Sequence, residues 1–265
     1  MSLKVRLIPC LLLMNGRLVR SERFELHQVI GYPVQEVARF NEWAVDELIY
    51  LDISRDDVYD SGRDDHKQKS IGSALGILDV ISANCFMPLT FGGRIRNLDD
   101  MSARFARGAD KITVNTAAID TPAIIEAGAQ RFGNQAIVVS VDVRRHLDSG
   151  AYEVFTAAGH RATGLDPVAW SRQAEDLGAG EILLNSIDRD GTGEGYDLDL
   201  IAAVSSAVTI PVVALGGVGV YEHLAPAVIE AGASAVAAAN IFHFKELSDR
   251  QAKRALRRAG IDVRT

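Results

Sequence analysis

The chain has 265 residues, of which 48% are hydrophobic and 24% are charged, and its formal net charge is −7. This length suits either one (β/α) barrel or two smaller domains, and the hydrophobic content is too high for extensive disorder. The acidic balance disfavours general binding to nucleic acids or to anionic membranes.

The first apolar run, residues 7–14, is interrupted by Pro9 and is too short to span a bilayer. The sequence contains two cysteines, Cys10 and Cys85, which fall on or just before predicted strands. Two such cysteines are typical of buried, reduced thiols rather than of a disulfide framework. We therefore expect a cytoplasmic protein without a membrane segment.

Eight apolar runs of strand length alternate with segments of helical period, which is the pattern of parallel strands buried on both faces. We predict strands at residues 5–12, 47–53, 87–91, 111–115, 136–142, 181–185, 211–215 and 235–238. We predict helices at residues 33–44, 69–82, 98–106, 121–131, 166–177, 198–207, 220–230 and 246–258. Eight such units favour a (β/α)8 TIM barrel that spans residues 1–265, with an open doubly wound sheet as the alternative.

In a (β/α)8 barrel, functional residues lie at the C-terminal ends of the strands and in the loops that follow them. Long loops are predicted at residues 13–32, 54–68, 143–165 and 186–197. All four follow strands, so they belong to the predicted active face.

The second half of the chain repeats the first. Residues 8–13 (IPCLLL) align with residues 138–143 (VVSVDV), which places Leu12 opposite Asp142. Glu47 aligns in the same way with Glu181, and the pair Gly92-Gly93 aligns with Gly216-Gly217. Offsets that are constant within blocks and change between them indicate a duplicated half-domain, and we predict two homologous half-barrels at about 1–132 and 133–265.

Two glycine pairs end equivalent strands, and polar residues end the strands beside them. Glycine lets the backbone approach a phosphate closely, and a following helix N-terminus attracts anions. The predicted phosphate-binding residues are Gly92, Gly93, Arg94, Asn115 and Thr116 in one half, and Asp190, Gly191, Gly216, Gly217, Ala239 and Asn240 in the other. Two matched clamps predict a ligand with two phosphates, although a glycine pair can also serve only a tight turn.

Arg94 follows the first glycine pair, where the second pair is followed by Val218. An arginine could add a bidentate phosphate contact, or it could fill the place of a phosphate, or it could be a solvated loop residue. The sequence leaves these alternatives open.

Several segments together resemble a known family. They are IPCL at 8–11, NGR at 15–17, DELIYLDI at 46–53, PLTFGGRIR at 88–96, GADKITVNTAA at 108–118, GAGEILLNSIDRDGTGEGYDL at 178–198 and FHF at 242–244. In this order, over essentially the whole chain, they resemble the cyclase subunit of imidazole glycerol phosphate synthase.

The resemblance implies a barrel whose floor binds a glutaminase subunit and whose interior carries ammonia to the mouth. There the family's lyase and cyclase reaction uses ammonia on a ribulose-bearing bisphosphate of histidine biosynthesis. Two aspartates act as general acid and base. One falls on Asp142, and a carboxylate at the C-terminal end of a barrel strand is typical of catalysis. The other falls on Leu12, which cannot transfer a proton.

Other mouth positions also depart from the family. Arg20 stands where the family has lysine, Arg94 replaces a third glycine, Asn185 replaces threonine, and Leu215 replaces a small serine-like residue. Arg20, Asp52 and Asn185 are expected to orient the substrate.

The floor matches the family. Arg6, Glu47, Lys111 and Glu181 begin four strands and correspond to the charged ring that gates ammonia entry. Without the resemblance, a structural salt-bridge network is the simpler interpretation. With it, four retained charges indicate that the entry route is still used.

We expect no metal and no cofactor, because His146, His160 and His243 show no metal-ligand spacing and the 188–195 loop lacks the ligand pattern of an EF-hand. Three hypotheses remain. The first is a divergent paralogue that takes ammonia from a glutaminase and supplies it, through a separate amidotransferase, for amidination of a nucleotide-linked surface sugar. The second is the genuine cyclase of histidine biosynthesis. The third is a noncatalytic module that binds a bisphosphate metabolite.

Overall fold

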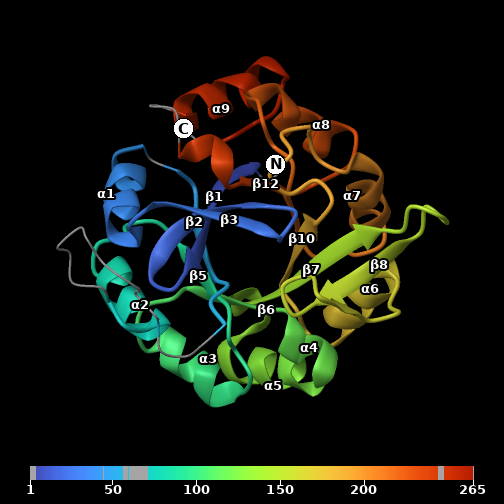
Figure 1. The fold of residues 1–265 in the computed structure, drawn as a ribbon. Coiled ribbons are helices and arrows are strands. Elements are labelled where there is room, and N and C mark those ends of the chain that lie inside the picture. The colour runs from blue at the N-terminus through green and yellow to red at the C-terminus, as the bar shows by residue number, and fades with distance from the viewer. Residues whose placement is uncertain (1–3, 44, 56–58, 60–70, 244–247, 265) are drawn as a thin grey trace.

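Eight parallel strands close into a barrel in the computed structural model, which describes residues 4–43, 45–55, 59, 71–243 and 248–264. The barrel strands are β1 (Arg6–Met14), β4 (Leu48–Asp52), β5 (Leu89–Gly92), β6 (Lys111–Val114), β7 (Ile137–Arg145), β10 (Glu181–Ser186), β11 (Val212–Leu215) and β12 (Ala235–Ala238). Pairing of β1 with β12 and of β7 with β10 completes the ring (Figure 1). The predicted (β/α)8 barrel is confirmed, and the open sheet is excluded.

Helices surround the barrel on its outside (Figure 1). They are α1 (Pro33–Trp43), α2 (Ala74–Ser82), α3 (Leu98–Phe105), α4 (Thr116–Asp120), α5 (Ala123–Phe132), α6 (Pro167–Asp176), α7 (Leu198–Ser205), α8 (Leu224–Ile229) and α9 (Ser248–Arg258), with short 3-10 turns η1 (Asn134–Ala136), η2 (Tyr221–His223) and η3 (Asn240–Phe242). Pro33 and Pro167 begin their helices, where a missing N–H is harmless.

Some predicted helix limits are wrong. The helix predicted at 69–82 begins at Ala74, because the Ser73 side chain caps it by accepting a hydrogen bond from the Gly76 N–H at 3.1 Å. The helix predicted at 220–230 is divided into η2 and α8, and α4 was not predicted. Residues 44, 69–70 and 246–247 of the predicted helices lie outside the described residues.

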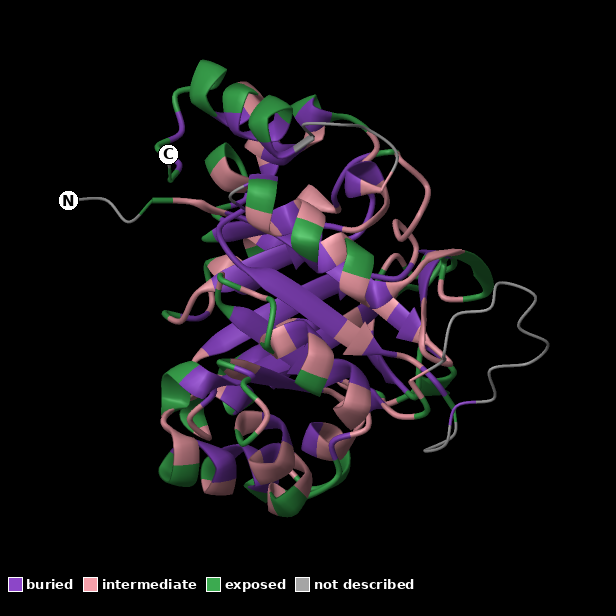
Figure 2. Cartoon of the chain, turned by 90° about the vertical axis from the view of Figure 1, so that its left-hand side faces the viewer, coloured by how far each residue is buried: buried purple, intermediate pink, exposed green. Residues whose placement is uncertain are grey.

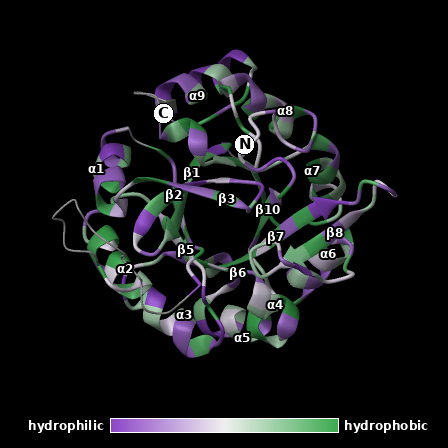
Figure 3. Ribbon diagram, in the orientation of Figure 1, coloured by the Kyte–Doolittle hydropathy of each residue, from purple (hydrophilic) through white to green (hydrophobic). Residues whose placement is uncertain are grey.

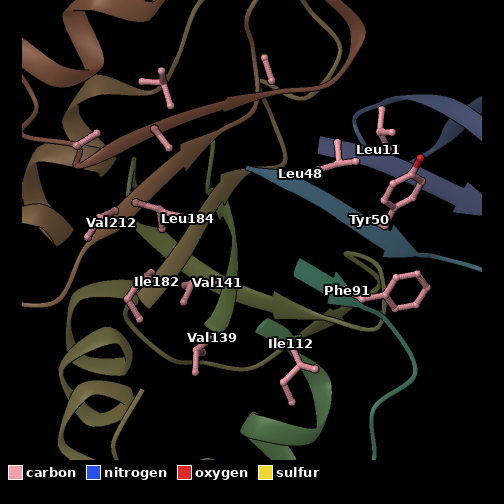
Figure 4. Close-up of a cluster of buried hydrophobic side chains, with 14 of the residues drawn as sticks. Leu11, Leu48, Tyr50, Phe91, Ile112, Val139, Val141, Ile182, Leu184 and Val212 are labelled. Atoms are coloured by element: carbon pink, nitrogen blue, oxygen red, sulfur yellow. The ribbon is translucent and has the colours of Figure 1, made fainter. Parts of the chain in front are cut away.

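The strands bury side chains on both faces. Leu11, Tyr50, Phe91, Ile112 and Leu184 point outward into the core shared with the helices (Figure 4), whereas a second cluster fills the barrel interior. That inner cluster comprises Ile8, Cys10, Ile49, Val138, Leu183, Val213, Leu215, Ala235 and Ala237, with Leu51 packed against it. Figures 2 and 3 show the buried, hydrophobic strands inside a ring of helices with polar outer faces.

The segments predicted as loops at 13–32 and 143–165 instead contain β-hairpins. The first contains β2 (Arg17–Glu22) and β3 (Leu26–Gly31), and the second contains β8 (Tyr152–Thr156) and β9 (Arg161–Ala162). β1 and β7 both run beyond the barrel and pair antiparallel with the next strand. The hairpins follow the two strands that the internal repeat aligns, which supports our proposal of two half-barrels. Most of the loop predicted at 54–68 lies outside the described residues.

Candidate functional site

Four charged side chains meet at the N-terminal end of the barrel. Arg6 Nη1 donates to both carboxylate oxygens of Glu47, at 2.9 and 3.0 Å, and Arg6 Nη2 pairs with Glu181. Lys111 Nζ lies 3.1 Å from an oxygen of Glu47 and 3.1 Å from an oxygen of Glu181. The predicted ring residues therefore come together, with each cation placed between two carboxylates.

These four side chains, Arg6, Glu47, Lys111 and Glu181, are called the floor ring below. The ring is largely closed to solvent, since the exposed fractions of its side chains lie between 7% and 20%. Burial alone would raise the pKa of Glu47, but the Arg6 and Lys111 charges outweigh it, and the pKa lies below its ordinary value. Buried charges of this kind are tolerated only when they are well paired.

Above the floor, one side of the barrel interior carries hydroxyl groups. Thr90 and Thr113 are each 3% exposed, and Ser140 is 9% exposed. Their strand neighbours on β5, β6 and β7 belong to the outer core, so alternation along a strand turns these three side chains inward. The facing wall, from β11 and β12 to β1 and β4, is formed by the apolar inner cluster.

Asp142 stands at the C-terminal end of the barrel, above Ser140 on β7. Its carboxylate accepts hydrogen bonds from Asn115 Nδ2 at 3.1 Å and from Ser140 Oγ at 3.4 Å. Burial raises its pKa to about 7, and the Asp190 charge acts in the same direction, while the Ser140 and Asn185 hydrogen bonds oppose the rise. A carboxyl group with such a pKa can give or take a proton near neutrality.

Leu12 occupies the matching position on β1. Its Cα pairs with those of Leu51 on β4 and Val19 on β2, and its side chain is half-buried. The mouth thus carries an ionisable group on the β7 side and an aliphatic one on the β1 side.

Asn185 is the second-last residue of β10, and Asp52 is the last residue of β4. Asn185 is 5% exposed, its Cα pairs with that of Asp142, and within the described chain its Oδ1 has no hydrogen-bond partner. Asp52 is buried and accepts from the N–H and the Oγ of Ser54, at 3.0 and 2.5 Å. Asp52 therefore shapes the turn after β4, and burial raises its pKa in spite of these hydrogen bonds.

The second glycines of the two pairs adopt matching conformations, whereas the first glycines differ, since Gly216 has φ +97° and Gly92 ends β5 without a positive φ. Gly93 has φ +95° and Gly217 has φ +101°. A Cβ on Gly93 would lie 2.0 Å from the carbonyl oxygen of Asp52, and one on Gly217 would lie 2.1 Å from that of Gly195. Each position requires glycine both for its left-handed backbone and for this close approach.

The residues around the first pair are held by specific contacts. Arg94 has φ +58° and donates from Nη1 to the carbonyl of Ser54, which follows β4, at 2.9 Å. Thr116 Oγ1 donates to Asn115 Oδ1 at 3.3 Å and accepts from the Ala157 N–H at 3.2 Å. Beside the second pair, Asn240 follows Ala239 and donates to the Ser21 carbonyl at 3.4 Å.

The loop that contains Asp190 and Gly191 packs against the first hairpin. Asp190 Oδ2 accepts from Ser21 Oγ at 2.7 Å and from the Phe24 N–H at 3.3 Å. A Cβ on Gly191 would lie 2.3 Å from the Ser21 carbonyl oxygen. In this structure the Asp190 carboxyl group thus holds the β2–β3 hairpin.

The β2–β3 hairpin lies across the barrel mouth (Figure 1). Its turn and the β8–β9 turn border a cavity of about 170 Å³, lined by Arg23, Phe24, Arg144, Phe155, Gly159 and His160 among others. Arg20 lies on β2 opposite Gln28 and its side chain is exposed.

Two absences hold within the described part of the chain. No helix there is long and apolar enough to cross a membrane. No group of three His, Cys, Asp or Glu side chains there is placed to hold a metal ion.

A family model and individual relatives identify the same family. The family model described as "Histidine biosynthesis protein" matches residues 6–248. The chain is 47% identical to imidazole glycerol phosphate synthase subunit HisF of Hyphomonas neptunium, over 99% of each chain. It is 46% and 45% identical to the HisF subunits of Streptomyces avermitilis and Streptomyces coelicolor, over the full length of each. The chain belongs to the HisF family.

Sequence reasoning overlooked some polar residues of this HisF-family barrel. The inward hydroxyls of Thr90, Thr113 and Ser140 could have been found from the alternation of polar and apolar residues within each predicted strand. The contact between Ser21 and Asp190 joins residues 169 positions apart, and no local pattern indicates it.

Asp142→Asn is expected to change how stability depends on pH. The pKa of Asp142 is about 7 in the folded protein and 3.8 when unperturbed, so the folded state binds this proton more tightly than the unfolded state. From pH 5 to pH 8 the parent should therefore lose about 1–3 kcal/mol of unfolding free energy relative to the Asp142→Asn variant. Urea denaturation at both pH values measures this, with Asp148→Asn at the exposed β7–β8 turn as control. A difference between parent and variant that does not change with pH would contradict the assignment.

Proposed function

We propose that this HisF-family barrel receives ammonia from a glutaminase at its floor, passes it through the barrel, and no longer closes the imidazole ring at its mouth. The observation that carries the proposal is the combination of a fully paired Arg6, Glu47, Lys111 and Glu181 ring with Leu12 opposite Asp142. In this proposal the ammonia entry at the floor is kept, while one of the two proton-transfer groups that the family resemblance implies is lost.

The interior supports an ammonia route. Ammonia is small and uncharged, so it can cross an apolar barrel that would exclude ammonium. Thr90, Thr113 and Ser140 offer hydrogen-bond partners on one side between the floor ring and Asp142. The floor ring at the base of this route would then act as the ammonia gate.

The mouth supports binding of a phosphorylated ligand. Thr116, after Asn115, begins α4, and Asn240, after Ala239, begins η3, so both offer backbone N–H groups that suit phosphate. Gly92-Gly93 and Gly216-Gly217 lie at the ends of the neighbouring strands β5 and β11, where glycine lets the backbone approach a ligand closely. We propose that Asn185, whose buried Oδ1 has no partner among the described residues, helps to orient the ligand, together with Arg20 and Asp52. We assign the Asp190–Gly191 segment mainly to placing the hairpin over that ligand.

Loss of the β1 acid limits the chemistry. Ring closure in the family, as the sequence resemblance implies, needs protons to be given and taken on both sides of one substrate. Asp142 alone, with a pKa of about 7, supplies one such group. We therefore propose a divergent paralogue whose ammonia goes to a separate amidotransferase and is used on a nucleotide-linked sugar of a surface polysaccharide.

A second candidate is the genuine cyclase of histidine biosynthesis. It is favoured by identities of 45–47% over the full length to three proteins named as HisF subunits of imidazole glycerol phosphate synthase. In that case a water or a hairpin group would have to replace the β1 acid. The two candidates share the floor and differ only at the mouth.

Both candidates require ammonia to enter at the floor, and this is tested by mixing the barrel with the HisH-type glutaminase of its own genome. We expect co-elution and a rise in glutamine hydrolysis of about tenfold or more when the barrel is added. Glu181→Gln, which breaks the floor ring, should weaken this coupling, whereas Glu126→Gln on the exposed face of α5 should not. If the glutaminase neither binds nor responds to the parent barrel, the proposed route has no source of ammonia.

A further inference from the structure

The mouth of the barrel has two chemically different sides. A polar side is formed by Asp142 on β7, Asn185 on β10 and Asn115, which follows β6. Leu12 and Leu51 form an apolar side on β1 and β4, where their Cα atoms pair. Both leucines are only half-buried, so apolar surface remains open to whatever occupies the mouth.

The apolar side continues inward without a polar interruption. Leu51 packs against the inner cluster that contains Cys10, Ile49 and Leu215. Leu215 is 8% exposed, and its Cα pairs with that of Asn185, so it marks the border between the two sides. A hydroxyl group placed against Leu12 and Leu51 would lose its hydrogen bonds to water and gain none from these side chains.

A ligand that fills this mouth must match both sides at once. Its polar edge can form hydrogen bonds with the Asp142 carboxyl group and the Asn115 and Asn185 amides. Its other edge binds most favourably if it places carbon atoms, rather than hydroxyl groups, against the leucines. A sugar hydroxylated at every carbon presents hydroxyls on both edges. A deoxy or methyl-bearing sugar can place its less polar edge on the leucines.

We propose that the natural ligand of this mouth is a sugar phosphate ester with a deoxygenated or methyl-bearing carbon that lies against Leu12 and Leu51. This rests on the proposed function in one respect, because it uses the same mouth and at least one of the two phosphate clamps. It adds the class of sugar and makes Leu12 a specificity-determining residue as well as a missing acid.

The test compares glucose 1-phosphate with two esters that each lack one of its hydroxyls, 2-deoxyglucose 1-phosphate and 6-deoxyglucose 1-phosphate. Dissociation constants are measured for the parent barrel by ligand-detected NMR titration. We expect at least one deoxy ester to bind about fivefold or more tighter than glucose 1-phosphate. Leu12→Asp should reduce that preference to about twofold or less, because a carboxylate can accept from a hydroxyl.

Leu147→Asp is the matched control, because it makes the same chemical change at the fully exposed β7–β8 turn and should leave the preference intact. The inference is overturned if none of the esters binds saturably, if neither deoxy ester is preferred, or if the preference survives Leu12→Asp. None of these outcomes depends on the glutaminase, so failure here is distinguishable from failure of the proposed ammonia route.

Discussion

Leu12→Asp is expected to raise cyclase turnover by about two orders of magnitude or more. The change places a second carboxyl group at the mouth, on β1 across from Asp142 on β7, and so supplies the missing proton-transfer group. The half-buried position leaves the new carboxylate access to water, and we expect little loss of stability. Turnover is measured with saturating ammonium salt and the family's ribulose-bearing bisphosphate.

Two variants separate proton transfer from simple polarity. Leu12→Asn has nearly the shape of the aspartate variant but cannot exchange a proton, and Leu147→Asp adds a carboxylate far out on an exposed turn. Neither should raise turnover. A gain in Leu12→Asn equal to that in Leu12→Asp would show that the mouth needs a polar group rather than an acid.

Arg6→Met is expected to cost about 3–5 kcal/mol of unfolding free energy at pH 7. It leaves Glu47 and Glu181 near one another with only Lys111 between them. Because the pKa of Glu47 is lowered in the folded state, the ring stabilises the protein above the unperturbed value of 4.5 and loses this effect as the pH falls through the folded value. The gap between parent and variant should therefore shrink toward pH 4, as urea denaturation will show.

Arg258→Met, on an exposed residue in the last turn of α9, is the matched control and should change stability by about 0.5 kcal/mol or less. An Arg6→Met variant as stable as this control would mean that the floor ring contributes nothing to the fold. That result would contradict the proposal that paired charges hold the floor ring closed.

The barrel could be predicted because its strands are buried on both faces and so read as short apolar runs separated by helices. The glycine pairs could be predicted because backbone contacts at Gly93 and Gly217 exclude any side chain. The floor ring was foreseen mainly through the family resemblance, since strand-initial charges alone indicate only salt bridges. In each of these cases a local pattern or a specific motif records the physical constraint.

The hairpins were missed for different reasons. The turn after β1 contains Asn15-Gly16 at φ +50° and +78°, and Asn-Gly is a pair typical of tight hairpins, so this hairpin has a local sequence signal. The turn before β9 places Ala157 and Ala158 at φ +53° and +55°, where alanine is unusual, so its sequence gives no signal. The role of Asp190 depends on a contact with Ser21 that only the folded chain brings about.

The most direct measurement is the cyclase rate of the unmodified barrel beside that of the Streptomyces avermitilis HisF subunit, with which it shares 46% identity. Both are supplied with saturating ammonium salt and the ribulose-bearing bisphosphate, so the glutaminase plays no part. With Leu12 in place of an acid, we predict a rate of about 1% or less of that relative. A rate within about threefold of the relative's would contradict the loss of ring closure and favour the genuine cyclase.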